Sequence, residues 1–318
     1  MSELAGAVVV VGSLNCDFVT RVTRRPSGGE TVMGQSFDLF VGGKGNNQAI
    51  ACARAGADVS IVGRVGADAF ADLIVERLDA AGVRRDHLAR DLEAGTGVAD
   101  IQVDATGQNA IVVVPRANAR VCPSDIDAAG ELLDRARVVL VQLEIPIDAV
   151  LHAAVRAKRA GAYVILNPAP APAAPLPAAL YASIDLITPN ESEARSLTGV
   201  DARDDEGAEA AGRALLRLGA PRSLLTLGER GTLLVEPSGA RRAPAFPVDV
   251  VDTTAAGDAF CGALAAQLAS GASLERAIAF GRAAGALACT RLGAEPSLPL
   301  RAEIDQLMAR GGARRALS

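Results

Sequence analysis

The sequence DVVDTTAAGDAFCGALAAQLASG, residues 249–271, joins a short β-branched run to a long apolar run through a turn of small residues. This pattern predicts a strand, a tight turn and a helix of about a dozen residues. Two aspartates, Asp252 and Asp258, flank the turn. Because open α/β sheets bind ligands where strands end and helices begin, the segment indicates both a fold class and a site.

The turn between the two aspartates has the properties of an anion site. The first N–H groups of a helix lack internal partners and carry partial positive charge. Small side chains at Ala255, Ala256 and Gly257 let a phosphate-sized anion approach that backbone. Asp258 would repel the anion unless it has a chemical task, such as taking a proton from an incoming hydroxyl as a general base.

A simpler interpretation of the same turn is an ordinary helix start. The helix would then be capped by Asp252, Thr253 or Thr254. Asp258 would be a first-turn acid that interacts favourably with the helix dipole. A carboxylate at a helix N-terminus is also expected to have a lowered pKa, which would make Asp258 a weak base.

Strand-like and helical runs alternate along most of the remaining chain, which predicts parallel βαβ units in a layered α/β fold. The expected strands are residues 7–13, 58–66, 136–144, 163–168, 185–190 and 223–228, the last one paired across a turn with 231–236. Helical spacing follows most of them, as in residues 46–57, 67–83, 146–162 and 191–199. The proline-rich residues 168–180 are expected to form a stiff loop.

Two regions interrupt this alternation and predict antiparallel pieces. Residues 17–40 mix charges, Pro26 and a short strand-like run, and residues 97–114 have the pattern of a hairpin. Together they could form a small sheet over the mouth of a site, a lid. The alternative is that they extend the edge of the main sheet.

Composition limits the classes of protein that remain. With 318 residues, 50% of them hydrophobic, the chain can bury a large core, and we expect a single domain over residues 1–318. A net charge of −5 argues against nucleic-acid binding, and no apolar run approaches the roughly 18 residues of a membrane helix. Five cysteines without a CxxC pair indicate reduced thiols in a cytoplasmic protein. With only two histidines, a His-rich metal site is excluded.

Two further motifs contain residues suited to ligand binding. FVGGKGNNQA, residues 40–49, is glycine-rich and precedes a helix, but it lacks the spacing of a Walker A loop. GSLNCDF, residues 12–18, places Asn15 and Asp17 at the end of the first strand, where they could hold sugar hydroxyls or simply form a turn. No GxGxxG fingerprint follows that strand, which argues against a nicotinamide-dependent oxidoreductase.

Eight short segments together resemble the ribokinase-like (PfkB) carbohydrate kinase family in order and spacing. They are GSLNCDF, GGKGNNQA, VQLEIP, LNPAP, TPNESEA, TLGERG, DTTAAGDAF and TRLGAEPS, and the resemblance extends from about residue 8 to residue 305. It implies a three-layer α/β/α fold with a mostly parallel central sheet and a small β lid, often shared in a homodimer. It also implies ATP-dependent phosphorylation of a small sugar, D-ribose at its 5-hydroxyl, with Mg²⁺ and activation by a monovalent cation, usually K⁺.

The resemblance assigns a role to each matching position. Asp258 would be the catalytic base, beside an anion hole at Ala255, Ala256 and Gly257. The sugar would be held by Asn15, Asp17, Gly43, Lys44, Asn47 and Glu144. Mg²⁺ and the phosphates would be organised by Asn190 and Glu193, with Thr226, Gly228 and Gly231 at the nucleotide. The monovalent cation would be bound by Asp252 and by oxygens of Thr254, Ala288, Arg291, Gly293 and Ser297, which suits a hard cation.

Four positions depart from the family pattern. Cys16 stands where a smaller residue is expected, and a thiol so close to the sugar could be oxidised. Asn46 replaces an alanine before Asn47, so either asparagine could face the sugar. Arg116 replaces a glycine, which leaves the choice of sugar open, and Arg282 falls near the expected adenine site.

Other functions on the same fold stay open at this point. Kinases of 2-deoxyribose, fructose or a nucleoside are the nearest alternatives, although only 3% of the residues are aromatic, which favours a small sugar over a base. A non-catalytic sugar-binding protein is a more distant alternative. Such a protein would normally have lost the base or the anion hole, and Asp258 and Ala255 to Gly257 are all present.

Overall fold

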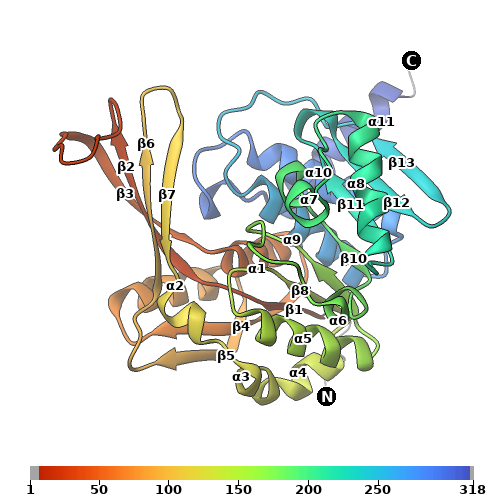
Figure 1. Ribbon diagram of the computed structural model, residues 1–318, viewed down its shortest axis with the longest axis horizontal. Coiled ribbons are helices and arrows are strands. Elements are labelled where there is room, and N and C mark those ends of the chain that lie inside the picture. The colour runs from red at the N-terminus through yellow and green to blue at the C-terminus, as the bar shows by residue number, and fades with distance from the viewer. Residues whose placement is uncertain (1–6, 316–318) are drawn as a thin grey trace.

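The computed structural model describes residues 7–315 and has two sheets of different size (Figure 1). The larger sheet has nine strands in the order β13-β12-β11-β10-β9-β8-β1-β4-β5, and only its pairings of β12 and β13 are antiparallel. Its strands are β1 Ala7–Val11, β4 Asp58–Gly66, β5 Arg84–Asp91, β8 Val138–Val141, β9 Tyr163–Leu166, β10 Leu186–Ile187, β11 Ser223–Thr226, β12 Thr232–Glu236 and β13 Gly239–Ala243. The predicted mostly parallel sheet is therefore confirmed, including the β11–β12 hairpin.

Helices cover both faces of the large sheet (Figure 1), which makes the three layers. On one face pack α1 Lys44–Arg54, α2 Ala69–Ala80, α9 Ala256–Ala269, α10 Leu274–Ala288 and α11 Arg301–Arg315. On the other pack α3 Pro123–Ala128, α4 Gly130–Arg135, α5 Ile147–Arg159, α6 Ala178–Tyr181, α7 Glu191–Thr198 and α8 Asp205–Arg217. Strand β1 shows why two cores form, since Val8 and Val10 enter one core and Val9 and Val11 the other.

The smaller sheet stands apart from the large one and is called the lid here. Its strands, in the order β3-β2-β6-β7, are β3 Gly34–Gly42, β2 Asn15–Val22, β6 Gly97–Val103 and β7 Asn109–Val114. The expected hairpin of residues 97–114 and the expected strand run before residue 40 are both in it. The prediction of a separate small sheet is confirmed, and the alternative of an edge extension is wrong.

Three local predictions differ from the structure. Strand β5, RRDHLARD, was not expected, because an edge strand that pairs only with β4 can carry charged residues along its length. Residues 249–251 are not a strand, since they find no neighbouring strand and Val250 and Val251 are exposed. The loop of residues 168–180 ends in the short helix α6, which begins at Ala178.

Helix α1 lies unusually close to its neighbours because glycines form the contacts. A Cβ at Gly45 would lie 2.6 Å from the backbone of Gly12 and Ser13, and one at Gly262 of α9 would lie 2.5 Å from the Cβ of Ala51. These approaches bring the polar face of α1 up to both β1 and α9. The part of the chain that the structure describes also contains three short 3-10 helices, η1 Arg116–Arg120, η2 Gly228–Arg230 and η3 Glu295–Ser297.

All five cysteines are free thiols, as predicted. Among residues 7–315, no helix has the length and apolar character needed to cross a membrane.

Candidate active site

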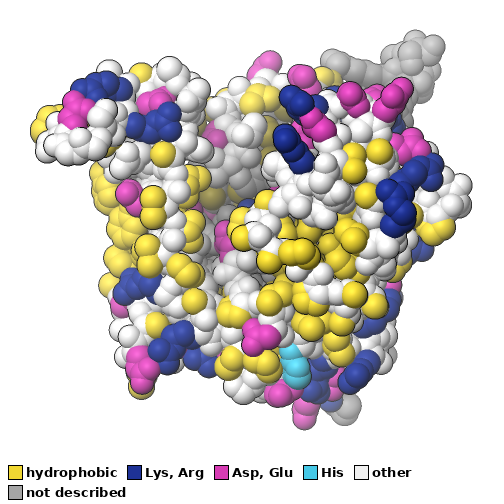
Figure 2. All heavy atoms as spheres, in the orientation of Figure 1, with side chains coloured by type: hydrophobic (Ala, Val, Ile, Leu, Met, Phe, Trp, Pro, Cys, Tyr) yellow, Lys and Arg dark blue, Asp and Glu magenta, His cyan; other side chains and the backbone are white. Residues whose placement is uncertain are grey.

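The carboxyl ends of five parallel strands lie along the edge of the large sheet from which the lid continues, since lid strand β2 follows β1 directly. The polar residues that follow them are Ser13 and Asn15 after β1, Glu144 after β8, Asn167 after β9, Asn190 after β10 and Thr226 at the end of β11. Strand β1 has β4 on one side and β8 on the other, so the direction of strand succession reverses here. Open α/β sheets bind ligands at such a switch point. Figure 2 shows a hollow between the lid and the helical body at this edge.

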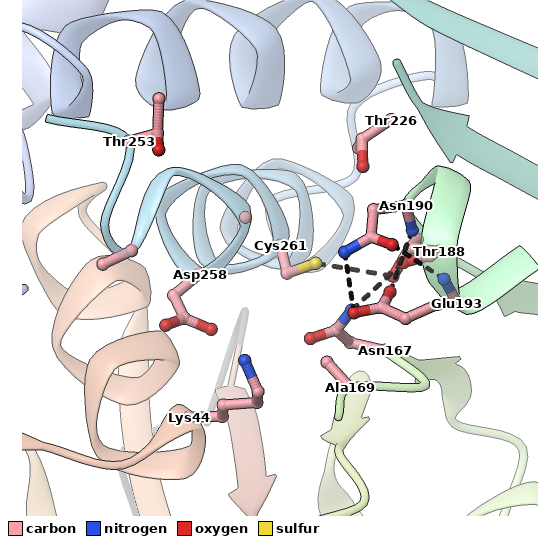
Figure 3. Close-up of a pocket in the computed structure, with 12 residues that line it drawn as sticks. Lys44, Asn167, Ala169, Thr188, Asn190, Glu193, Thr226, Thr253, Asp258 and Cys261 are labelled. Atoms are coloured by element: carbon pink, nitrogen blue, oxygen red, sulfur yellow. Dashed lines mark hydrogen bonds between the residues drawn. The ribbon is translucent and has the colours of Figure 1, made fainter. Parts of the chain in front are cut away.

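Two adjoining cavities occupy this edge. The smaller, of ≈ 190 Å³, is lined by Lys44 of α1, Glu193 of α7 and Asp258 of α9. The larger, of ≈ 800 Å³, opens beside it, and residues Asn190, Thr226 and Gly257 line both. In the close-up, Lys44 and Asp258 point toward each other across the smaller cavity (Figure 3).

Asp258 lies at the centre of a buried hydrogen-bond network. Its side chain accepts from Asn47 Nδ2 at 3.1 Å and from Gln48 Nε2 at 2.9 Å, and the residue is 7% exposed. Burial raises the pKa of Asp258, although Lys44 and the two amides oppose the shift. The expected lowering of this pKa is wrong, because desolvation beneath α1 outweighs the helix N-terminus. Asp258 is thus a stronger base than an ordinary aspartate.

The start of α9 is not capped by any described side chain, so the capping alternative is wrong. Its N-cap residue is Ala255, in the left-handed conformation at φ 58°, and Asp252 instead accepts from the N–H and hydroxyl of Thr254. A Cβ placed on Gly257 would meet no atom within 4 Å, because it would point into open space. The first turn of the helix therefore faces the cavities with accessible backbone.

The six predicted sugar residues lie where β1, the lid and α1 meet, and of these six only Lys44 lines one of the two cavities. Glu144 Oε2 accepts from Ser13 Oγ at 2.5 Å and from the Lys44 N–H at 3.0 Å. Gly43 packs against the backbone of residues 13–15, where a Cβ would lie 2.8 Å from Asn15 N. Asn15 and Asp17 belong to the first residues of lid strand β2 rather than to β1 itself.

The charges of this cluster are strongly coupled. Burial, together with the carboxylates of Glu144 and Asp258, raises the pKa of Asp17 to about 7. Burial disfavours the charge of Lys44, but Asp258, Glu144 and Glu193 more than compensate and raise its pKa. The carboxylates stabilise the Lys44 ammonium but repel one another, and groups with such perturbed pKa values are concentrated at functional sites.

Asn47 and Asn46 have different environments. Asn47 contacts Asp258, and its buried Oδ1 has no partner among the described residues, so it is available to a ligand hydroxyl. Neither asparagine lines a cavity, and Asn46 makes no contact of this kind with Asp258. It is fully buried, and both polar atoms of its amide lack hydrogen-bond partners in the part of the chain described.

Replacing Asn46 with alanine is therefore expected to stabilise the fold by about 1–3 kcal/mol, because it removes a buried amide that makes no hydrogen bond. Chemical denaturation of the two proteins measures the difference in the free energy of unfolding. The matched variant is Asn47→Ala, which removes a bonded amide and should not stabilise. A loss of stability in Asn46→Ala would contradict this description of its environment.

The larger cavity has an apolar wall and a polar rim. The wall includes Phe246, Val250 and Phe260, and the rim includes the predicted Thr226, Gly228 and Gly231. Arg282 of α10 lines it too, with its guanidinium carbon 5.3 Å from the centre of the Phe246 ring. The volume and mixed lining are typical of a cavity for a small organic ligand.

Asn190 and Glu193 form a capping box at the start of α7. The Asn190 side chain accepts from the Glu193 N–H at 2.8 Å, and the Glu193 carboxylate accepts from Asn190 N and Nδ2, both at 2.9 Å. The buried Glu193 side chain has a raised pKa, mainly through desolvation. The same pair thus fixes the helix start and presents a carboxylate to the smaller cavity.

Asp252 joins the turn before α9 to the loop after α10. Its Oδ2 accepts from the Gly293 N–H at 2.9 Å, and its backbone N–H donates to Cys289 O. Burial opposes its charge, but the hydrogen bonds from Thr254 and Gly293 lower the pKa of Asp252. Elsewhere in this loop the Arg291 side chain pairs with Glu303, and Ser297 Oγ donates to Ala294 O. Within residues 7–315, no group of three or more His, Cys, Asp or Glu side chains is arranged as a metal site.

Several residues of the site were not predicted. Gln48 lines neither cavity but donates to both Asp258 and Asn167, and Thr188 and Cys261 line the smaller cavity beside them. A signal for Gln48 exists in the sequence, since Lys44, Asn47 and Gln48 share one helical face. Cys16 is fully buried and its thiol pKa is raised to about 12, mainly by desolvation, which opposes the expected oxidation.

Comparison with known proteins relates nearly the whole chain to carbohydrate kinases. The pfkB family carbohydrate kinase pattern matches residues 6–301. A ribokinase of Staphylococcus aureus is 39% identical over 96% of this chain and 100% of its own, and a deoxyribokinase of Salmonella typhi is 34% identical over 92% and 95%. The structure of Arabidopsis thaliana ribokinase complexed with ribose and ATP superposes with a TM-score of 0.89 at 36% identity, covering 96% of this chain and 99% of that one. The chain belongs to the pfkB family of carbohydrate kinases.

Proposed function

We propose that this carbohydrate kinase transfers the γ-phosphoryl group of ATP to the 5-hydroxyl of D-ribose. The observation that carries the proposal is the position of Asp258, a buried carboxylate of raised pKa beside the uncapped start of α9, where two cavities meet. An acceptor held by the cluster around Lys44 and Glu144 and a phosphoryl donor in the larger cavity would meet at this carboxylate. The relatives named as ribokinases, one of them with ribose and ATP, support this choice of substrates.

In this account Asp258 takes the proton of the attacking hydroxyl. The backbone at Ala255, Ala256 and Gly257 stabilises the charge on the transferring phosphoryl group, as a helix N-terminus does for anions. Asn47 and Gln48 hold the Asp258 carboxylate in place. Phosphoryl transfer depends on positioning and charge stabilisation, which is what these fixed groups provide.

A sugar fits the hydrogen-bonding character of the cluster beneath the lid. Asp17 and Glu144 are acceptors and Lys44 is a donor. Asn15 uses its Oδ1 and Asn47 its Nδ2 within the protein, which leaves the other polar atom of each amide for a ligand. Each sugar hydroxyl both donates and accepts, so an alternation of donors and acceptors matches a small polyol. The Asn190, Thr226, Gly228 and Gly231 side of the larger cavity would hold the nucleotide.

The residues present also suit Mg²⁺. It binds proteins through one or two carboxylates together with substrate phosphates and water, and Glu193 offers one buried carboxylate to the smaller cavity. Asn190 would orient that carboxylate. When bound with ATP, the metal would neutralise charge on the phosphates.

A monovalent cation fits the loop around Asp252. The hydrogen bond from Gly293 to Asp252 holds the turn before α9 against residues 288–297, where the predicted carbonyl and hydroxyl oxygens lie. Oxygen ligands with one carboxylate are the chemistry that K⁺ prefers. Asp252, Thr254, Ala288, Arg291, Gly293 and Ser297 would hold it and thereby fix the geometry of the anion hole.

ADP release from MgATP tests these proposals together. D-Ribose is expected to stimulate ADP release, and K⁺ is expected to raise the rate severalfold over the same concentration of a bulky ammonium salt. Asp252→Asn should lose most of the K⁺ effect. Turnover of 2-deoxy-D-ribose at a higher kcat/KM than D-ribose would instead favour the activity named for the Salmonella relative. Absence of turnover with either pentose would contradict the proposal.

We also propose that the 318 residues form one kinase domain that acts as a homodimer in the cytoplasm. Strand β7 carries exposed apolar residues, and Ile111 and Val113, 52% and 46% exposed, lie on the same face of the lid as Asp17. Figure 2 shows apolar side chains gathered on the lid. A second lid would cover this face. Sedimentation velocity should show a dimer that Ile111→Asp with Val113→Asp converts to monomer, and a monomeric parent protein would contradict it.

A further inference from the structure

Asn118, in the short helix η1, makes three buried hydrogen bonds to the junction between β1 and the lid. Its Oδ1 accepts from Leu14 N at 2.9 Å, and its Nδ2 donates to Leu14 O at 3.0 Å and to Asn15 Oδ1 at 2.7 Å. The residue is 1% exposed. Its amide is therefore fully used by two consecutive residues of the lid root, one of which is a proposed sugar ligand.

The bonds of Asn118 determine the orientation of the Asn15 amide. Because Asn15 Oδ1 accepts from Asn118 Nδ2, the Nδ2 group of the Asn15 amide is turned away from Asn118. The nearby side chains Asp17 and Glu144 can only accept when ionised. A sugar hydroxyl that donates to one of these carboxylates still needs a donor for its own oxygen, and Asn15 in this orientation is such a donor.

The pair of amides packs directly against the backbone of the lid root. A Cβ at Gly97 of β6 would lie 2.2 Å from Asn15 Oδ1 and 2.3 Å from Asn118 Nδ2. The glycine at this position therefore makes space for the pair of amides. Helix η1 also holds the residue before β6, since Arg116 Nη1 donates to Thr96 O at 3.0 Å, a bond that does not involve Asn15.

We propose that Asn118 is a positioning residue for sugar binding, which holds Asn15 as a hydrogen-bond donor toward the sugar and ties that donor to the lid root. The inference rests on the proposed function, because it needs a sugar at Asn15. Asn15 and Asn118 both lie outside the two cavities, and the inference assigns Asn118 an effect on acceptor affinity and not on nucleotide affinity.

A double-mutant cycle between residues 15 and 118 tests this inference. Equilibrium binding of D-ribose is measured for the wild type, Asn15→Ala, Asn118→Ala and the double variant. Asn118→Ala is expected to raise the Kd for ribose about 10- to 100-fold in the wild-type background, but less than about threefold in the Asn15→Ala background. KM for ATP should stay within about threefold of the wild type in each protein.

Arg116→Ala is the matched control, since it loosens the same helix from the lid root without touching Asn15. Its effect on ribose binding should be the same in both backgrounds. If Asn118→Ala does not fold, Asn118→Ser replaces it in the double-mutant cycle. Its hydroxyl lies near Leu14, but the side chain is too short to reach Asn15. Asn15→Asp keeps the acceptor for Asn118 but turns an acceptor toward the sugar, and it should weaken ribose binding as much as Asn15→Ala.

The failures of the two proposals can be told apart. If the wild type neither binds nor phosphorylates D-ribose, the proposed function is wrong. If the wild type binds ribose and Asn118→Ala raises the Kd equally in both backgrounds, the proposed function stands and the role of Asn118 is only structural. Wild-type affinity in Asn15→Asp would also overturn the inference, because a donor at this position would then be unnecessary.

Discussion

Asp258→Asn is expected to lower kcat for ribose phosphorylation by about 10²- to 10⁴-fold, because the variant cannot accept the proton of the attacking hydroxyl. The Kd for ribose should change little. An asparagine of the same shape keeps an acceptor for Asn47 or Gln48, and the other sugar residues are untouched. Single-turnover kinetics with saturating MgATP and ribose, together with a ribose titration, measure the two quantities separately.

The control for this variant is Asp249→Asn, which removes an exposed carboxylate before the same turn. It should leave kcat and Kd close to those of the wild type. If Asp258→Asn retained full turnover, Asp258 would not be the base. A loss of ribose affinity as large as the loss of kcat would show that Asp258 acts mainly by binding the sugar.

Gly257→Ala is expected to stabilise the protein while lowering kcat by about 10²-fold or more. Gly257 is in the first turn of α9, where alanine restricts the unfolded chain and adds about 0.4–1 kcal/mol of stability. The added methyl group would meet no protein atom within 4 Å, so folding should tolerate it. It would instead occupy the space in which the transferring phosphoryl group contacts the backbone.

Thermal unfolding and steady-state kinetics of one preparation measure the expected gain in stability and the expected loss of kcat together. Gly28→Ala serves as the control, because a Cβ there also meets no atom within 4 Å but Gly28 lines neither cavity. It should leave activity unchanged. Full activity in Gly257→Ala would contradict the anion hole, and a destabilised Gly257→Ala would contradict the open space beside α9.

The layered fold could be predicted from local patterns, because most of the buried parallel strands, such as β4 and β8, are short apolar runs followed by a helix. Strand β5 could not, since its edge position allows a charged sequence that resembles a loop. Residues 249–251 show the opposite case. Their β-branched pattern favours a strand, but strand formation needs a neighbour to pair with, and sheet neighbours are set by the tertiary fold.

The site was predictable where chemistry is local and unpredictable where it depends on distant residues. Small residues beside Asp258 indicate an anion site at a helix start, and the structure leaves that start uncapped. The predicted direction of the Asp258 pKa shift was wrong, because α1, more than two hundred residues earlier in the chain, buries the carboxylate. No local pattern in the sequence predicts the hydrogen bond between Asn118 and Asn15.

The central claim is that the chain phosphorylates the 5-hydroxyl of D-ribose, and ³¹P NMR of the reaction product tests it most directly. A mixture of the protein, MgATP, K⁺ and D-ribose should give ADP and one new phosphomonoester, coupled to the C5 protons of the sugar. A phosphomonoester on another carbon, or ATP that stays unchanged in the presence of ribose, would contradict the account.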